Sequence, residues 1–167
     1  MTAPGPAHGA PAANLASNPI RILVVCWGNS ARSILAEALL RHLGGDRVEA
    51  HSAGIEAHGV HPLTLQVLRD AGLPTAGLRS KLVDEFLGQQ FDYVITVCDD
   101  ARAACPVFPG AAESLHWGYP DPAKAEGTDA DRLAAFERVF TQLGERIHQF
   151  LPIAERFTAT RGPVELA

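Results

Sequence analysis

Hydrophobic residues follow two kinds of pattern along the chain, and the first kind predicts strands. Ile20–Val25 (IRILVV) and Asp92–Val97 (DYVITV) are short, mostly apolar runs rich in β-branched residues. Such runs are typical of strands buried on both faces of a parallel sheet. Arg47–His51 and Ser114–His116 are further short segments that we predict as strands. The pattern therefore predicts a sheet of four strands.

The second kind of pattern has apolar residues every three or four positions and predicts helices. Ser33–Leu43 carries such a stripe and is followed by two glycines, which commonly end a helix. Pro62–Ala71 starts with proline, which is favoured in the first turn of a helix. The longest stripe starts at about Asp129 and includes Leu133, Phe136, Phe140, Leu143, Ile147 and Leu151.

The alternation of strands and helices predicts an α/β fold with three layers, in which a parallel sheet carries helices on both faces. Ligands of such folds bind beyond the carboxyl ends of the strands. Residues 20–152 form one predicted domain, residues 1–19 a disordered tail, and residues 153–167, which lack periodicity, a loose C-terminal tail. Cys26 and Cys98 both follow predicted strands, so the architecture can bring them to one edge.

Composition narrows the functional classes. The chain has 167 residues, 47% of them hydrophobic, and a formal net charge of -5, so it has no basic surface for nucleic acid or acidic lipid. No apolar run is long enough to cross a membrane, and the N-terminal segment lacks the features of a signal peptide. An odd number of cysteines, three, argues against a secreted disulfide framework and favours a cytoplasmic protein.

The segment between the first strand and the first helix, Cys26–Ser33 (CWGNSARS), has the features of an oxyanion-binding loop. It holds a cysteine and an arginine six positions apart at a strand-to-helix junction. Backbone N–H groups of such a loop converge on one point, where the helix dipole adds positive potential, so it can hold a tetrahedral oxyanion even on an acidic protein. The predicted anion-binding residues are Trp27, Gly28, Asn29, Ser30, Ala31, Arg32 and Ser33.

The same potential favours a thiolate, so we expect Cys26 to be a nucleophile at neutral pH. Ser33 can donate a hydrogen bond to its sulfur, and Gly28 can supply a positive φ in the tight loop. Asn29 can lock the loop through side-chain hydrogen bonds to the backbone. Asp121, in a proline-stiffened loop, is the candidate proton donor to a leaving oxygen, although Asp-Pro alone is a common turn.

The loop and its neighbours resemble a known family. Cys26–Ala38 closely resembles the phosphate loop of the low-molecular-weight tyrosine phosphatases, and Asp121-Pro122 resembles their general-acid loop. Three segments resemble the thioredoxin-coupled arsenate reductases of that fold in particular: Ser52–Gly59 (SAGIEAHG), Val97–Pro106 (VCDDARAACP) and His116–Tyr119 (HWGY). The resemblance spans about Ile20 to Leu151, and the cysteine pair of the second segment is its most specific part.

The resemblance implies a thiol relay. Cys26 would attack the arsenic of arsenate while Asp121 protonates the displaced oxygen. Cys98 would then attack the Cys26 sulfur, which releases arsenite, and Cys105 would attack Cys98. Thioredoxin would reduce the resulting Cys98–Cys105 disulfide, so the segment between these cysteines should be mobile and unfold in part on oxidation. Phosphate or sulfate would compete with arsenate, and the enzyme would act as a monomer.

Some members of this family bind a potassium ion beside the loop, near the positions of Asn29, Glu37 and Ser52. An expected acidic ligand falls at Lys81 here. We hypothesise that the Lys81 ammonium replaces the ion and bonds toward Asn29 or Glu37. No bound cofactor or metal is expected, because His51, His58, His61, His116 and His148 lack metal-ligand spacing. The predicted loop-supporting residues are Asn29, Ser33, Glu37, Ser52 and Lys81.

Two alternatives remain open. A protein tyrosine phosphatase would use Cys26, Arg32 and Asp121 in the same roles. Such enzymes usually carry aromatic residues after Asp-Pro, whereas this chain has Ala123–Ala125, and they have no use for a second cysteine pair. The other alternative is a non-enzymatic oxyanion-binding or redox-sensing module, which would not require an acid loop.

Overall fold

The computed structural model describes residues 18–108, 111 and 113–161. Most of the predicted N-terminal tail, and residues 162–167 of the predicted C-terminal tail, lie outside this range. In chain order the elements are β1 (Ile20–Cys26), α1 (Arg32–Gly44), η2 (Gly45–Arg47), β2 (Val48–Gly54), α2 (Pro62–Asp70), η3 (Val83–Phe86), β3 (Tyr93–Thr96), α3 (Asp99–Ala104), β4 (Glu113–His116), η4 (Pro122–Lys124) and α4 (Asp129–Arg161), where η denotes a 3-10 turn.

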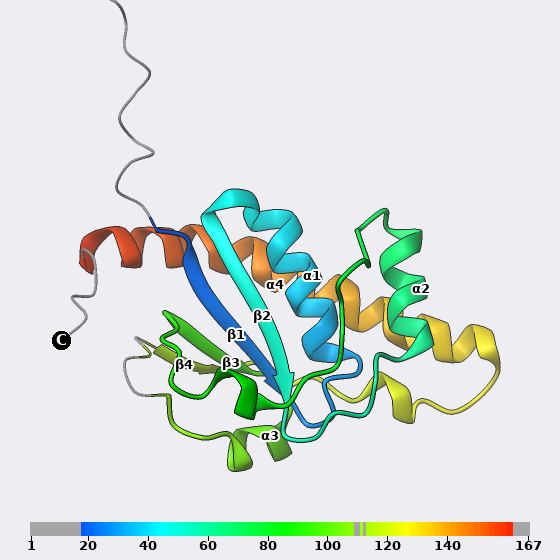
Figure 1. Cartoon of the computed structure of the whole chain (residues 1–167). Coiled ribbons are helices and arrows are strands. Elements are labelled where there is room, and N and C mark those ends of the chain that lie inside the picture. Colours follow the sequence, from blue (N-terminus) through cyan, green and yellow to red (C-terminus); the bar gives the residue numbers. More distant parts are fainter. Residues whose placement is uncertain (1–17, 109–110, 112, 162–167) are drawn as a thin grey trace, which may run out of the picture.

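The four strands form one parallel sheet in the order β2-β1-β3-β4, which confirms the predicted fold class (Figure 1). β1 is central and almost fully buried, as its apolar sequence requires. Its register pairs Cys26 with Gly54 of β2, so the nucleophile candidate lies at the carboxyl edge of the sheet.

The two faces of the sheet are covered differently. Ser52 of β2 contacts Glu37 of α1, and α1 packs against α4 on that side (Figure 1). His51 precedes Ser52, so its side chain points to the opposite face. There it packs on Phe86 of η3, with ring centroids 5.3 Å apart. Beside β2 the second face is therefore covered by the short turn η3 and its aromatic side chain.

The prediction that residues 153–167 form a loose tail is wrong for residues 153–161, the part of this segment that the structure describes. α4 continues through Pro152 to Arg161. Proline removes one helical hydrogen bond, but tertiary contacts hold the helix after it. Ala154 is fully buried, and Glu155 forms an ion pair with Arg47. No described helix is long and apolar enough to span a bilayer.

Candidate active site

The sheet brings the predicted site residues to its carboxyl edge. Cys26 is the last residue of β1, Cys98 lies two residues after β3, and Asp121 follows β4. Because neighbouring parallel strands end at the same edge, three segments far apart in the sequence meet around the loop that starts at Cys26.

The loop is held open by hydrogen bonds to its carbonyl groups. The carbonyl of Trp27 accepts from Glu56 N–H, that of Gly28 from His58 N–H, and that of Ser30 from His61 N–H, at 2.8, 2.9 and 3.1 Å. The C=O and N–H of one peptide unit point in opposite directions. The N–H groups of the following residues therefore point to the other side, toward the loop centre. This arrangement suits an oxyanion.

Cys26 is buried and has two polar contacts inside the loop. Its sulfur accepts a hydrogen bond from Asn29 N–H at 3.2 Å and lies 2.7 Å from the Ser33 hydroxyl. Ser33 is therefore positioned to donate a hydrogen bond to the Cys26 sulfur, as predicted. The prediction for Gly28 is wrong, because Asn29 takes the positive φ, 45°. Gly28 matters for space instead: a Cβ there would lie 2.5 Å from the His58 ring.

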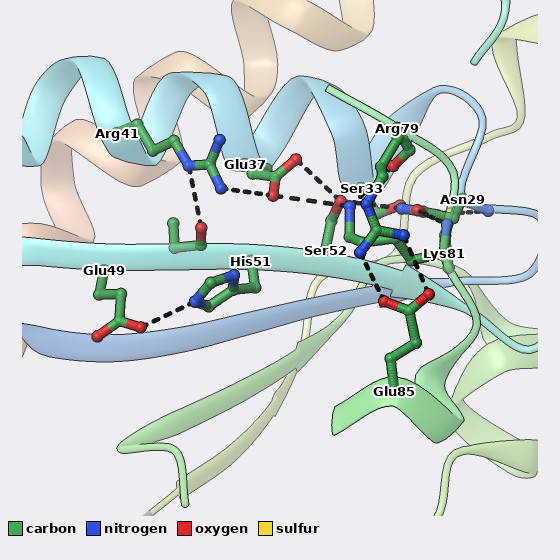
Figure 2. A network of polar contacts seen from close by, with 12 residues as sticks. Asn29, Ser33, Glu37, Arg41, Glu49, His51, Ser52, Arg79, Lys81 and Glu85 are labelled. Atoms are coloured by element: carbon green, nitrogen blue, oxygen red, sulfur yellow. Dashed lines mark hydrogen bonds and ion pairs between the residues drawn. The ribbon is translucent and has the colours of Figure 1, made fainter. Parts of the chain in front are cut away.

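Asn29 is fully buried and fixes the loop through three side-chain hydrogen bonds (Figure 2). Its Oδ1 accepts from the backbone N–H of Lys81 at 2.8 Å. Its Nδ2 donates to the hydroxyls of Ser33 and Ser52 at 2.8 and 2.9 Å. Ser52 donates onward to Glu37 at 3.1 Å. One connected network thus joins the predicted supporting residues, and only one of Asn29's three partners is backbone.

Lys81 lies in this network with its ammonium buried. Nζ donates to the Arg79 carbonyl at 2.8 Å and lies 3.8 Å from a carboxylate oxygen of Glu37. The ammonium thus faces Glu37, whereas Asn29 is contacted by the main chain of Lys81. Burial lowers the pKa of Lys81, and the charge of Glu37 opposes that shift. A potassium ion does not fit beside these residues, because the buried Lys81 ammonium already faces Glu37 and would repel a second cation.

Arg32 connects the anion-binding loop, Cys26–Ser33, to the acid loop, which is the loop that carries Asp121. Its Nη1 donates to the Tyr119 carbonyl at 3.0 Å, and its Nη2 lies 3.7 Å from Asp121 Oδ2. Asp121 also accepts from Ala123 N–H at 3.0 Å, which caps η4 and fixes the carboxylate. The predicted anion-binding arginine and the predicted proton donor are therefore neighbours.

Cys98 lies beside the loop. Its buried sulfur accepts a hydrogen bond from Ala101 N–H at 3.3 Å. Burial raises the pKa of the Cys98 thiol, while the N–H groups of Ala101 and Trp27 and the Arg32 charge lower it; the adjacent Cys26 raises it further. Trp27, Arg32 and Cys26 all belong to the loop, so Cys98 and Cys26 share one environment.

Cys105 lies at the far end of α3. Burial raises the pKa of its thiol, which is half-buried and 3.6 Å from the Pro106 carbonyl. The family resemblance implied a mobile segment between Cys98 and Cys105, and the structure has the six-residue helix α3 there. All three cysteines are free.

Two supporting residues were not identified from the sequence. Gly54 leaves no room for a side chain, because a Cβ there would lie 2.2 Å from Glu56 O and 2.7 Å from Asn29 N. Arg41 forms an ion pair with Glu37 at 3.0 Å. The four-residue spacing of Glu37 and Arg41 on a predicted helix could have indicated that pair. Trp117 is a buried packing residue, with its ring against Phe150.

Across the described part of the chain, no three His, Cys, Asp or Glu side chains are grouped so that they could hold a metal ion. The chemistry that the geometry offers is that of a nucleophilic thiol in an anion-binding loop, a neighbouring carboxylic acid, and a second thiol within the same site.

Comparisons with known proteins agree with this geometry. The family model for low molecular weight phosphotyrosine protein phosphatases matches residues 21–160. An arsenate reductase of Halalkalibacterium halodurans is 43% identical over 77% of this chain and 93% of its own length. An arsenate reductase of Bacillus licheniformis is 42% identical, over 80% of this chain and 96% of its own.

Among solved structures, a thioredoxin-dependent arsenate reductase of Corynebacterium glutamicum has 28% identity and a TM-score of 0.67. The match covers 87% of this chain and 67% of that one. These findings confirm the resemblance drawn from the loop and the cysteine pair. The chain belongs to the low molecular weight phosphotyrosine protein phosphatase family, and within it to the arsenate reductases.

Proposed function

We propose that this protein reduces arsenate to arsenite through a relay of its three cysteines. The observation that carries the proposal is the position of Cys98: the backbone N–H of Val97 bonds to the Val25 carbonyl at 2.9 Å, so the next residue of each segment, Cys98 and Cys26, lies at the same edge of the sheet. A phosphatase needs only the loop and the acid. A buried second thiol in the same site gives the loop a partner for electron transfer.

In the first step the Cys26 thiolate attacks the arsenic of an arsenate held by the loop N–H groups and Arg32. A new S–As bond forms, one As–O bond breaks, and Asp121 supplies the proton with which the oxygen leaves. The 3.7 Å separation of Arg32 and Asp121 supports these roles, since one anion can contact both groups.

In the second step Cys98 attacks the Cys26 sulfur. An S–S bond forms while the S–As bond breaks, and its electron pair stays on arsenic, which leaves as arsenite. Arsenic is reduced by two electrons and the two thiols are oxidised to the Cys26–Cys98 disulfide. The N–H group of Asn29 and the hydroxyl of Ser33, both at the Cys26 sulfur, support its role as leaving thiolate in the exchange that follows.

In the third step Cys105 attacks Cys98 and frees Cys26, which leaves a Cys98–Cys105 disulfide. These residues lie at opposite ends of α3. At about 1.5 Å per residue a helix keeps them about 10 Å apart, beyond the separation of about 7 Å that a disulfide tolerates. The relay therefore requires α3 to unwind, and we propose that thioredoxin reduces the disulfide so exposed.

Turnover tests the proposal directly. The protein is mixed with thioredoxin, thioredoxin reductase and NADPH, and NADPH consumption is followed with and without arsenate. We expect arsenate-dependent consumption that phosphate or sulfate inhibits. No consumption with any thiol reductant would contradict arsenate reduction, and a single stoichiometric oxidation would identify a redox sensor instead.

A phosphatase is the second candidate, because the loop and Asp121 would serve it equally well. The Cys98→Ser variant separates the two functions. We expect it to lose arsenate turnover while any hydrolysis of para-nitrophenyl phosphate survives. We further propose that the protein is a monomer acting in the cytoplasm, where a reducing environment keeps Cys26, Cys98 and Cys105 as thiols.

A further inference from the structure

The helix between Cys98 and Cys105 has little to hold it in place. α3 has six residues, and a helix of that length is not stable by itself in water. Only Ala101 of these six is buried; the other five are exposed. Within the described part of the chain, Asp99 is the α3 side chain that hydrogen-bonds another element.

Asp99 is the first residue of a chain of hydrogen bonds that ends inside the sheet. Its Oδ1 lies 2.8 Å from His116 Nε2 at the end of β4, and His116 Nδ1 lies 2.8 Å from Thr96 Oγ1 of β3. The Thr96 hydroxyl can donate to Nδ1, which is nearer than its other acceptor, the Leu115 carbonyl at 3.4 Å, while Nε2–H donates to Asp99. Thr96 is buried in the sheet, so its hydroxyl holds the imidazole of His116 in a fixed position.

A pocket lies beside the hydrogen bond between Asp99 and His116. Asp99, Gly118, Tyr119 and Pro120 line a cavity of about 300 Å³ between the start of α3 and the acid loop. A Cβ on Gly118 would lie 3.3 Å from His116 Nε2. The glycine therefore leaves the imidazole room to meet Asp99.

We propose that Asp99 and His116 are positioning residues whose hydrogen bond fastens the first turn of α3 to the sheet and sets how readily Cys98 and Cys105 pair. The inference rests on the proposed relay, since it concerns the step in which α3 unwinds. The bond exists when both cysteines are thiols. It breaks when the helix opens, so it stabilises the dithiol form relative to the disulfide and keeps Cys98 beside the loop for its earlier attack on Cys26.

The test measures the disulfide equilibrium without arsenate or thioredoxin. Full-length Cys26→Ser protein is equilibrated in buffers of reduced and oxidised dithiothreitol, and paired Cys98 and Cys105 are counted by alkylation and mass spectrometry. In that background Asp99→Ala and His116→Ala should each favour the disulfide about fivefold, a shift of about 20 mV toward a more negative potential. The double variant should shift no further than either single one, because both remove the same bond.

Matched controls separate the bond from general damage to the helix. Asp100→Ala removes a neighbouring exposed carboxylate of the same turn, and Asp99→Asn keeps an acceptor for His116; both should leave the equilibrium near that of the parent. Hydrogen exchange gives a second readout. In Asp99→Ala the amide of Arg102, bonded to the Cys98 carbonyl, should exchange faster while the β1 amides do not change.

The outcomes distinguish this proposal from the relay. If the disulfide forms but Asp99→Ala and His116→Ala leave its equilibrium unchanged, the positioning role is wrong and the relay stands. If no disulfide forms even in the most oxidising buffer, the relay and the positioning role both fail. Asp99 is exposed, so its alanine variant remains informative even if His116→Ala does not fold.

Discussion

The backbone N–H of Lys81 donates a hydrogen bond to Oδ1 of Asn29 at 2.8 Å, which ties the anion loop to a residue 52 positions later in the chain. Asn29 is the loop residue in the left-handed region, and its own N–H donates to the Cys26 sulfur. The shape of the loop around the nucleophile therefore depends on a contact that only the folded chain provides.

Replacing Asn29 should damage both stability and activity. Asn29→Ala leaves the buried Lys81 N–H without an acceptor and keeps a Cβ at positive φ without the amide hydrogen bonds that offset its strain, so we expect a loss of about 2–4 kcal/mol of unfolding free energy. Asn29→Gly loses the same hydrogen bonds without the steric strain and should be about 1 kcal/mol more stable than Asn29→Ala. Urea unfolding measures both. Equal stability of the two variants would argue against strain at this position.

Two glycines of the site should respond differently to alanine. A Cβ on Gly54 meets backbone atoms of Glu56, Asn29 and Trp27, which cannot move without distorting the loop. A Cβ on Gly28 meets the half-exposed side chain of His58, which can rotate away. We expect Gly54→Ala to cost at least about 2 kcal/mol and most arsenate turnover, and Gly28→Ala much less. Thermal unfolding and the coupled assay check this, and the reverse order would contradict the geometry.

Local structure around Cys26 could be predicted from the sequence, whereas the conformation of individual loop residues could not. The strand, loop and helix around Cys26 were predictable, because a buried apolar run, a cysteine-to-arginine spacing and an apolar stripe are local patterns. The positive φ was assigned to Gly28 because glycine adopts it most easily. It falls on Asn29, whose long-range hydrogen bonds outweigh the strain.

The end of α4 and the helix α3 were not predicted for a similar reason, because both depend on contacts that the local sequence does not indicate. The end of α4 was missed because residues 153–167 lack apolar periodicity, and the burial of Ala154 that holds the continuation is a tertiary contact. α3 was missed because its N-cap is the sulfur of Cys98, which is not among the usual capping residues. Its hydrogen bond to His116 depends on how β4 is placed in the sheet.

Potassium should not activate this enzyme. The buried Lys81 ammonium already faces Glu37, so arsenate turnover should be the same in potassium and choline chloride at equal ionic strength. Lys81→Ala leaves Glu37 with less positive charge around it and should lower turnover. The coupled assay in the two salts gives the answer, and a strong requirement of the unaltered enzyme for potassium would refute this role of Lys81.

Attack by Cys98 should become faster as pH rises. Burial raises the pKa of this thiol, so at neutral pH little of it is thiolate, and the thiolate fraction grows about tenfold per pH unit below the pKa. We expect the rate of Cys26–Cys98 disulfide formation in single turnovers to increase steadily between about pH 6 and 9. Hydrolysis of para-nitrophenyl phosphate, which does not use Cys98, is the control for general effects of pH. A flat profile for the disulfide step would contradict the assignment of Cys98 as the rate-setting nucleophile.

The most direct test of the relay stops it after its second step. Cys105→Ser protein, fully reduced and mixed with arsenate without thioredoxin, should release one arsenite per chain. Peptide mapping should then find Cys26 and Cys98 joined in one disulfide. Release of no arsenite, or arsenite without that disulfide, would contradict the account of Cys26 as the nucleophile and Cys98 as the thiol that reduces its arsenic adduct.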